Sequence, residues 1–373
     1  MKTLFFFGTL RHPPLLREVL GRDVEMVPAT LPDHAVHWAE GHGFPLLQAT
    51  PGARAQGVLV CGLGQTDVAR LDYYEGAFSF ILRALEVEVK QDKIAAEVYF
   101  PPHDRFKAGP LWHLEDWQRE FGALNTTAAR EIMRWFGRMS AEEMAARDLP
   151  IRIRAAGRLA AEARPADDDR VPTQDVVIEA HRSPYIGFFA MEEIRLRHRR
   201  YDGSMTVPLE RSALMSGQAA VVLPYDPIRD AVLLVEQFRA PVFMGGDPAP
   251  WVWEPVAGLV DPGETPDETA RREAVEEAGV ALRGLEPVGK AYSSTGITNE
   301  FLHLYIGLCD LPEVPSGGGG LAGEGEDIRA ELFPFEALMA QVDAQEVRDM
   351  PLLACALWLA RHRDRLRAPA ASA

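Results

Sequence analysis

Three glutamates lie close together in the second half of the sequence: Glu273, Glu276 and Glu277. On a helix, residues three and four positions apart share one face, so these carboxylates would form a stripe within an arc of roughly 100°. Such a stripe repels itself unless a cation lies among its members, and Arg272 could orient one of them. A hard divalent cation such as Mg²⁺ or Mn²⁺ is the natural partner. The alternative is an ordinary solvated helix face.

The flanking residues carry the signals of a helix from about Pro266 to Ala278. Thr265 suits the N-cap, proline suits the first helical position, and Glu268 completes a capping box. Gly279 suits the left-handed position that follows a helix. The sequence therefore predicts a capped helix that presents the three carboxylates on one side.

A single glutamate, Glu75, marks a second candidate site in the first half of the sequence, where it precedes Gly76. Far upstream, an apolar strand-like run ends at Gly8, which Thr9 and Leu10 follow. A glycine turn after a strand exposes successive backbone N–H groups, which can hold a carboxylate or an oxyanion. An acid–base role for Glu75 requires the two segments to converge on one cavity. Otherwise Glu75 is a surface carboxylate.

The pattern of apolar runs predicts two unrelated halves. Strand-like runs dominate the first hundred residues, and a helical pattern extends from Leu111 to about Met144. The stretch Ala163–Pro172 is polar and bounded by prolines, which makes it the best linker. The expected elements include strands at residues 2–7, 57–61, 81–89, 94–100, 176–178, 219–223, 231–236 and 302–308, and a C-terminal helix near 342–365.

Composition and charge exclude several classes of protein. Of the 373 residues, 47% are hydrophobic and 25% charged, as in a globular protein with sizeable cores. The net charge is 39 − 55 = −16, and residues 166–373 carry −15 of it, from 19 Lys and Arg against 34 Asp and Glu. Such an acidic surface opposes binding to nucleic acid or anionic lipid.

The cysteines and the absence of long apolar runs indicate the compartment. Cys61, Cys309 and Cys355 are far apart, which fits a reducing cytosol and argues against a metal site built from cysteine. No apolar run approaches the roughly 20 residues of a membrane span. The first residues lack a secretory signal. We expect a cytoplasmic protein without nucleic-acid or membrane partners.

The stretch from Gly258 to Val280 resembles the Nudix box, G-x(5)-E-x(7)-R-E-U-x-E-E-x-G-U with U aliphatic, at every defined position, with Ala274 as a common variant. The resemblance covers about residues 175–366. It implies an α/β/α sandwich around a mixed sheet, and hydrolysis of a nucleoside diphosphate linked to another moiety. A non-catalytic Nudix sensor is the alternative, but degenerate members usually lose box carboxylates and this chain keeps them.

Outside the box, the sequence is similar to the ADP-ribose (ADP-sugar) pyrophosphatase branch of that family. The similar segments are residues 185–189, 197–199, 219–227, 236–239, 254–258 and 324–329. The resemblance implies Mg²⁺ as the cofactor, with Mn²⁺ as the alternative, and a nucleoside diphosphate sugar as the substrate. The branch typically has proline where this chain has Thr295, so another ADP-linked or GDP-linked sugar stays open.

The resemblance also implies roles for individual residues. The expected metal ligands are the carbonyl of Ala257 and the carboxylates of Glu273, Glu276, Glu277 and Glu326. The expected base for the attacking water is Glu324. The expected substrate contacts are Phe188, which would stack on adenine, Arg211 and Arg239, which would pair with diphosphate or ribose oxygens, and Leu259, Ser294 and Glu300. The alternatives are a core aromatic for Phe188 and a surface residue for Arg211. We expect Glu277 to face solvent when no metal is bound.

The first half resembles the γ-glutamylcyclotransferase-like (AIG2-like) family, through the loop at Gly8, Thr9 and Leu10 and through the acidic residue Glu75. This resemblance covers about residues 3–102 and implies a β-barrel with helices. It implies Glu75 as the catalytic acid–base and the loop as the substrate-binding element. Phe7 stands where the family usually has tyrosine. Two interpretations stay open, an active cyclotransferase and a binding or structural module.

Together these patterns predict an α/β protein of two domains. We expect a γ-glutamylcyclotransferase-like domain at residues 1–105, a helical extension and linker at 106–165, and a Nudix domain at 170–366. The second resemblance implies a homodimer, because related pyrophosphatases complete the adenine pocket with the partner's N-terminal segment. In this chain that segment would be about residues 176–212.

Overall fold

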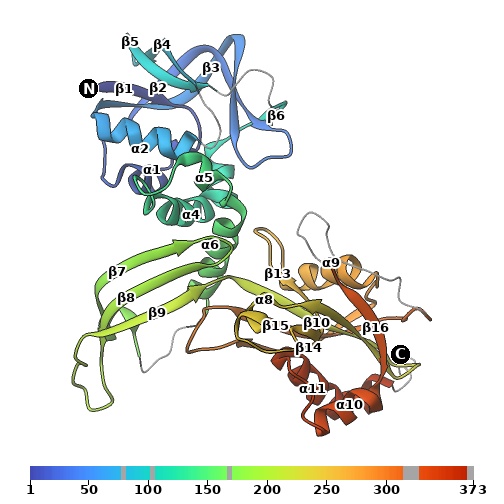
Figure 1. Cartoon of the computed structure of the whole chain (residues 1–373). Helices are drawn as coiled ribbons and strands as arrows, with labels where there is room; N and C mark the ends of the chain where they lie inside the picture. Colours follow the sequence, from blue (N-terminus) through green and yellow to red (C-terminus); the bar gives the residue numbers. More distant parts are fainter. Residues whose placement is uncertain (77–80, 101–105, 166–169, 314–326, 368–373) are drawn as a thin grey trace. The chain divides into compact units, whose positions relative to one another are not determined.

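The computed structural model describes residues 1–76, 81–100, 106–165, 170–313 and 327–367. They form two compact units (Figure 1). The first comprises Met1–Pro172 together with Tyr185–Phe188, and the second comprises Thr173–Pro184 together with Phe189–Ala373. Among the described residues, no helix is both long enough and apolar enough to cross a membrane.

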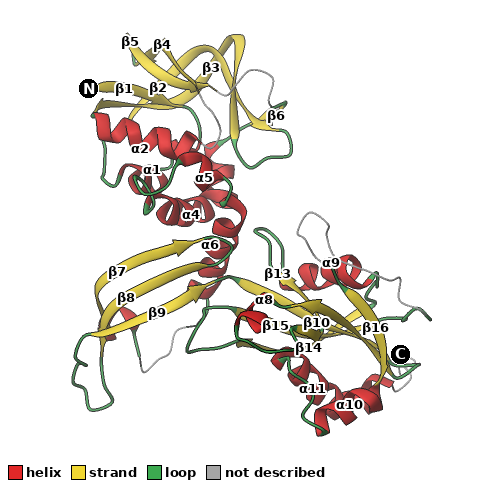
Figure 2. Ribbon diagram, viewed as in Figure 1, coloured by secondary structure: helices red, strands yellow, loops and turns green. Residues whose placement is uncertain are grey.

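A sheet of the first unit closes into a barrel (Figure 2). The strand order is β3-β1-β5-β4-β2-β6, and an additional β2–β3 pairing joins the ends of its five-strand path. β1 runs parallel to β5 and antiparallel to β3. The strands are β1 (Lys2–Phe6), β2 (Val27–Ala39), β3 (Pro45–Leu63), β4 (Ile81–Val89), β5 (Asp92–Phe100) and β6 (Ala108–Leu111).

The first strand is buried on both faces. Leu4, Phe5 and Phe6 are all at most 4% exposed, although successive side chains of a strand point to opposite faces. A strand covered on both sides reads as a continuous apolar run, which is why the sequence predicts a buried strand here. Because β1 is held on both faces, the position of the Gly8 loop that follows it is fixed as well.

Helices of the first unit pack against one another and against the barrel. α1 contacts α2 and α4, and α4 contacts α6. Trp117 is fully buried and donates its indole N–H to the carbonyl of Gly43 at 3.0 Å, which ties the helical segment to the barrel. The helical elements are η1 (Thr9–Arg11), α1 (Pro13–Leu20), α2 (Gln65–Glu75), α3 (Leu114–Trp117), the π-helical turn η3 (Gln118–Gly122), α4 (Ala123–Met133), α5 (Ala141–Ala145) and α6 (Asp148–Glu162).

The second unit contains two sheets. A mixed sheet has the path β12-β11-β10-β15-β14, with β13 paired to β10 and β16 paired to β11, and β7-β8-β9 form a smaller sheet. β10 and β15 are parallel. The strands are β7 (Val176–Ile186), β8 (Ala190–His198), β9 (Leu209–Met215), β10 (Gln218–Asp226), β11 (Ala231–Phe238), β12 (Trp251–Glu254), β13 (Val256–Leu259), β14 (Gly284–Tyr292), β15 (Phe301–Leu308) and β16 (Arg329–Pro334).

Helices cover both faces of the mixed sheet (Figure 2). The helices are α7 (Pro172–Asp175), α8 (Ala240–Met244), α9 (Pro266–Ala278), α10 (Phe335–Asp343) and α11 (Met350–Arg367). Along β10, Val221 and Leu223 join the core beneath α10 and α11, whereas Ala220 and Val222 join the core beneath α9. This alternation is the two-residue period of a strand packed on both sides. The predicted α/β/α sandwich and the predicted barrel are both confirmed.

Element boundaries differ from the sequence prediction at several places, of which the C-terminal helix and β3 are examples. The predicted helix from Val342 is wrong at its start, because α10 ends at Asp343 and α11 begins at Met350. Gln345 has a φ of 61°, which stops helical backbone, and the Asp349 carboxylate accepts the N–H of Leu352 at 2.7 Å to start α11. β3 is also much longer than the predicted strand at 57–61.

Candidate active sites

α9 has the predicted ends. The hydroxyl of Thr265 accepts the N–H of Glu268 at 3.3 Å, and the Glu268 carboxylate accepts the N–H of Thr265 at 2.8 Å. Gly279 closes the helix in the left-handed conformation, with a φ of 66°. The helix spans Pro266–Ala278, as its local signals predict.

An alanine face seats α9 closely on the sheet. Ala270, Ala274 and Ala278 are at most 3% exposed in the core beneath α9. Close seating brings the stripe against β13, where a Cβ on Gly258 would lie 1.8 Å from Oε1 of Glu273. The first glycine of the box therefore provides the space in which the Glu273 carboxylate lies.

Arg272 lies among the carboxylates and binds three of them. Its Nε and Nη2 donate to Glu264 at 2.9 and 3.0 Å. Its Nη1 donates to Glu273 at 2.6 Å and to Glu276 at 3.0 Å. The Arg272 hydrogen bonds hold the pKa of Glu264 below its ordinary value, so that carboxylate is ionised at neutral pH. Nη2 also reaches the carbonyl of Leu259, a predicted substrate contact, at 3.5 Å.

Glu277 is buried rather than solvent-facing, so that expectation is wrong. Its side chain is 3% exposed, and Oε2 accepts the N–H of Ala257 at 3.2 Å. The reason is its position on α9, three residues after Ala274 and next to Ala278, at the edge of the face that packs on the sheet. The contact puts the carboxylate beside the backbone of Ala257, another predicted metal ligand.

The donor set fits a hard divalent cation. Carboxylate and carbonyl oxygens are the ligands that Mg²⁺ and Mn²⁺ prefer, and the buried Glu277 needs a cationic or hydrogen-bonding partner. Among the described residues, no group of three or more His, Cys, Asp or Glu side chains has the geometry to hold a metal ion. Two of the predicted functional residues, Glu324 and Glu326, lie outside the described residues.

Other predicted residues of the second half occupy several elements. Arg239 donates to both carboxylate oxygens of the buried Glu254, through Nε at 2.8 and 3.0 Å. Arg211 lies on β9, where its Nη1 donates to the carbonyl of Glu210. The carbonyl of Ser294 accepts the N–H groups of two turn residues at 3.1 Å. Glu300 follows that turn, and its N–H donates to the hydroxyl of Thr298 at 3.1 Å.

Phe188 belongs to the first compact unit, although the sequence places it in the Nudix half. Its carbonyl accepts Nη1 of Arg154 at 2.9 Å, and Gly187 accepts the same atom at 3.3 Å. Arg154 is 5% exposed and pairs with Glu131 at 2.7 Å. The Glu131 carboxylate and the two carbonyls explain how the charged Arg154 side chain can be buried.

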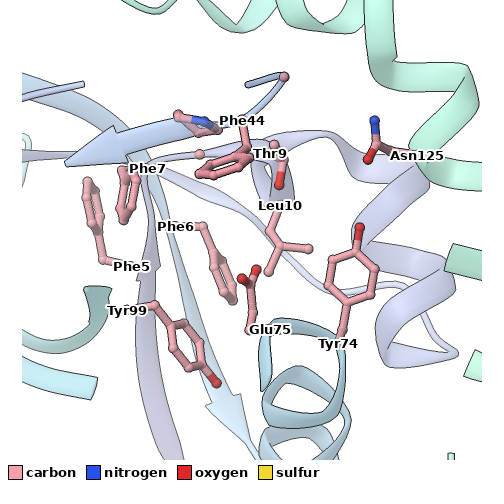
Figure 3. Close-up of a pocket in the computed structure, with 13 residues that line it drawn as sticks. Phe5, Phe6, Phe7, Thr9, Leu10, Phe44, Tyr74, Glu75, Tyr99 and Asn125 are labelled. Atoms are coloured by element: carbon pink, nitrogen blue, oxygen red, sulfur yellow. The ribbon is translucent and has the colours of Figure 1, made fainter. Parts of the chain in front are cut away.

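The segments that carry Gly8 and Glu75 converge on one cavity of the first unit (Figure 3). The cavity measures about 90 Å³ and is lined largely by aromatic side chains, including Phe6. Gly8 has no room for a side chain, because a Cβ there would lie 2.8 Å from Cγ of Pro45. The turn closes through the N–H groups of Arg11 and His12, so the N–H groups of Gly8–Leu10 take no part in it.

Glu75 points into this cavity beside Phe6 and Leu10 (Figure 3). Its carboxylate makes no hydrogen bond or ion pair with any residue in the described ranges. Burial raises its pKa from 4.5 to about 7, because the charged form is poorly solvated there. A carboxyl with a pKa near neutrality is suited to taking up and releasing a proton.

Sequence reasoning missed several cavity residues. Tyr74 points its hydroxyl toward Asn125 (Figure 3). Asn125 comes from α4, donates to the carbonyl of Phe121 at 2.9 Å and accepts Nη1 of Arg152 at 3.3 Å. Tyr99 donates to Asp72 at 2.7 Å. Tyr74 could have been found from its position beside Glu75, whereas Asn125 carries no local signal.

Comparisons with known proteins agree with this division. The family model described as NUDIX domain matches residues 215–353. The model described as gamma-glutamyl cyclotransferase, AIG2-like, matches residues 4–119. The sandwich and its carboxylate helix thus define a Nudix hydrolase, and the chain belongs to the Nudix family. Its N-terminal segment is AIG2-like.

Several relatives match about half of the chain. An ADP-ribose pyrophosphatase of Escherichia coli is 37% identical over 193 residues, 52% of this chain and 91% of the relative. An ADP-ribose pyrophosphatase of Haemophilus influenzae is 36% identical over 165 residues, which are 44% of this chain and 76% of the relative. A GDP-mannose pyrophosphatase of Cronobacter sakazakii is 33% identical over 162 residues, which are 43% of this chain and 83% of the relative. A solved structure titled "Crystal structure of ADP compounds hydrolase" has a TM-score of 0.41, is 17% identical, and covers 52% of this chain and 98% of its own. That last similarity is too weak to support an argument.

Proposed function

We propose that the second unit hydrolyses the diphosphate of ADP-ribose or a related ADP-sugar to AMP and a sugar phosphate, with Mg²⁺ as cofactor. The observation that carries the proposal is the α9 stripe, with Glu273 seated against Gly258 and Glu277 against Ala257. Two of the relatives above are named ADP-ribose pyrophosphatase. A third is named GDP-mannose pyrophosphatase, so a GDP-linked sugar is the alternative substrate.

The residues of the Nudix box would hold the metal ion and orient its ligands. Bound Mg²⁺, or Mn²⁺, neutralises charge on the phosphate oxygens. Glu273, Glu276 and Glu277, with the Ala257 carbonyl, would hold it, and Arg272 keeps the carboxylates in register. The water oxygen bonds to one phosphorus while the bond from that phosphorus to the bridging oxygen breaks. We assign the proton of the water to Glu324.

A substrate panel tests this proposal. The full-length protein is incubated with Mg²⁺ and ADP-ribose, another ADP-sugar or GDP-mannose, and kcat/KM is compared. AMP release with the highest kcat/KM for ADP-ribose is the expected result. Faster turnover of GDP-mannose would transfer the proposal to GDP-sugars. No turnover of any nucleoside diphosphate derivative would favour a non-catalytic sensor.

We also propose a cytoplasmic homodimer in which residues 176–212 of one chain complete the adenine pocket of the other. Phe188 and Arg211 are the residues that would be exchanged. The support is the resemblance to pyrophosphatases built this way and the exposed side chain of Phe188, 61% accessible. Light scattering should give a dimer, and a monomer with normal turnover would contradict the shared site. The segments 1–105, 106–165 and 170–366 stay our proposed domains.

We propose a second activity for the first unit, γ-glutamyl cyclotransfer. Glu75 and the Gly8–Leu10 loop line the same cavity, and the pKa of the Glu75 carboxyl there is about 7. The α-amine of a γ-glutamyl compound would bond to its own γ-carbonyl carbon, and the bond from that carbon to the leaving amine would break. Glu75 would take the ammonium proton and return it to the leaving amine. The loop N–H groups would stabilise the oxyanion.

Release of 5-oxoproline from γ-glutamyl peptides and amines tests this second activity. Wild type should release it and Glu75→Gln should not. Equal release by both proteins would show that the carboxylate has no role. No release by wild type, with saturable binding of a γ-glutamyl compound, would leave a binding module.

A further inference from the structure

A second hollow of the first unit, separate from the Glu75 cavity, has no role in either proposed reaction. This groove of about 380 Å³ runs over β2, β3 and the segment after β6. Arg11 enters it from η1, just after the loop that serves the Glu75 cavity. Apolar side chains such as Val36, Leu111 and Leu114 line much of the rest.

Two residues that line this groove each carry a hydrogen-bond donor that has no partner in the described part of the chain. Nε of Arg11 and Nε1 of Trp112 are both shielded from solvent and make no hydrogen bond. Trp112 is only 5% exposed, and the Arg11 guanidinium lies over its ring at 6.0 Å from the centroid. Buried donors in native proteins are almost always paired, so two at one groove call for an acceptor.

The charges of the groove limit what that acceptor can be. Arg54, which also lines it, is already paired with Glu88 and donates to Thr30 at 3.1 Å. Glu115 is exposed and interacts with Arg11 electrostatically without forming an ion pair with it. Burial lowers the pKa of Arg11, as expected of a poorly solvated guanidinium. Arg11 is thus the cation of the groove that forms no ion pair with a described residue, and Glu115 and Glu88 would repel a second negative charge on the acceptor.

We infer that this groove binds a monocarboxylate with a small apolar body, its carboxylate accepting hydrogen bonds from Arg11 Nε and Trp112 Nε1. A planar carboxylate has two oxygens, one for each donor. The apolar body would cover Val36, Leu111 and Leu114. Charge-assisted hydrogen bonds to a guanidinium are stronger than neutral ones, so Arg11 supplies most of the recognition.

The indole N–H signal of Trp112 in a ¹⁵N spectrum of the full-length protein tests the inference. The signal is assigned by its loss in Trp112→Phe. Titration with hexanoate should move it in a saturable manner, because the N–H gains an acceptor. Hexanol, which lacks the charge, should bind at least tenfold more weakly, and inorganic phosphate should leave the signal in place.

Arg11→Gln supplies the matched test, because the loop backbone and Trp112 are unchanged. It should weaken hexanoate binding tenfold or more, measured by calorimetry as well as by the Trp112 signal. Arg119→Gln is the control, since Arg119 is exposed, paired with Asp116 and outside the groove. An unmoved Trp112 signal, equal affinity in Arg11→Gln, or equal binding of phosphate would overturn the inference.

Discussion

The carboxylates of the two units face opposite environments. Glu75 stands alone in an aromatic cavity, and burial raises its pKa to about 7. Glu264, Glu273 and Glu276 share the guanidinium of Arg272, and its hydrogen bonds lower the pKa of Glu264. The same functional group is therefore prepared for proton transfer in one unit and for holding positive charge in the other.

Burial by itself does not explain the difference, because the neighbours of the carboxylates differ as well. Glu277 is only 3% exposed, more buried than most carboxylates, yet it lies beside a backbone N–H and a helix built around Arg272. Among the described residues that line its cavity, Glu75 has aromatic rings and no cation beside it. The comparison predicts that changes at the α9 stripe act through metal binding, whereas changes at Glu75 act through protonation.

The largest effect is expected from Glu277→Gln. Loss of one charged metal ligand should lower kcat for ADP-ribose hydrolysis on the order of 10³-fold, because several kcal/mol of charge stabilisation are lost. The amide oxygen of glutamine can still accept the N–H of Ala257, so the fold should persist. Rates over a Mg²⁺ titration measure this, with the exposed Glu331→Gln as control. An unchanged rate at saturating Mg²⁺ would remove Glu277 from the metal site.

The next effect concerns the pH dependence of 5-oxoproline release. As a base, Glu75 must be ionised, and a pKa of about 7 means that the rate should fall about tenfold for each pH unit below that value. Glu75→Gln should lose about 10²-fold or more and show no such inflection. Rate profiles of the two proteins provide the measurement. An inflection near the ordinary 4.5 would mean that the cavity does not desolvate the carboxylate.

A smaller effect is expected from Gly258→Ala. The added Cβ would displace the Glu273 carboxylate, since it would lie 1.8 Å from Oε1. Displacement of a ligand without its removal should reduce kcat about 10- to 100-fold and raise the Mg²⁺ requirement. Gly289→Ala on β14 is the control, because a Cβ there meets no atom within 4 Å. Equal activity of the two variants would show that Glu273 need not touch β13.

The smallest effect is on the stability of the first unit. The pKa of Glu75 is higher in the folded state, about 7 against 4.5, so the folded state binds more protons between these values. Stability should therefore fall as pH rises through this window, and Glu75→Gln should escape the loss. The shift bounds the gain at roughly 3 kcal/mol, and partial exposure to the cavity reduces it to about 1 kcal/mol.

Native-state hydrogen exchange of β1, corrected for the intrinsic rate at each pH, measures this gain. The advantage of Glu75→Gln should be absent below the lower pKa and complete above the higher one. Glu120→Gln, which alters an exposed carboxylate of the same unit, should show no such trend. A constant advantage at all pH values would point to altered packing and not to the charge.

Local signals in the sequence determined the features that depend on neighbouring residues. Thr265, Glu268 and Gly279 set the ends of α9, because caps and turns are satisfied within a few residues. The spacing of its glutamates determined that they share a face. The buried run of β1 follows from its apolar pattern, whereas the fold of each unit was implied by the resemblance of its motifs to a known family.

Tertiary structure alone decided which charges are buried and what they touch. Glu277 is buried because the alanine face of α9 rotates it toward β13, and the sequence pattern does not fix that rotation. Asn125 reaches the Glu75 cavity and Arg11 reaches Trp112 through packing between segments far apart in the chain. A pKa or an unsatisfied donor depends on the solvent that such packing removes, which is a property of the folded surroundings and not of any local stretch of sequence.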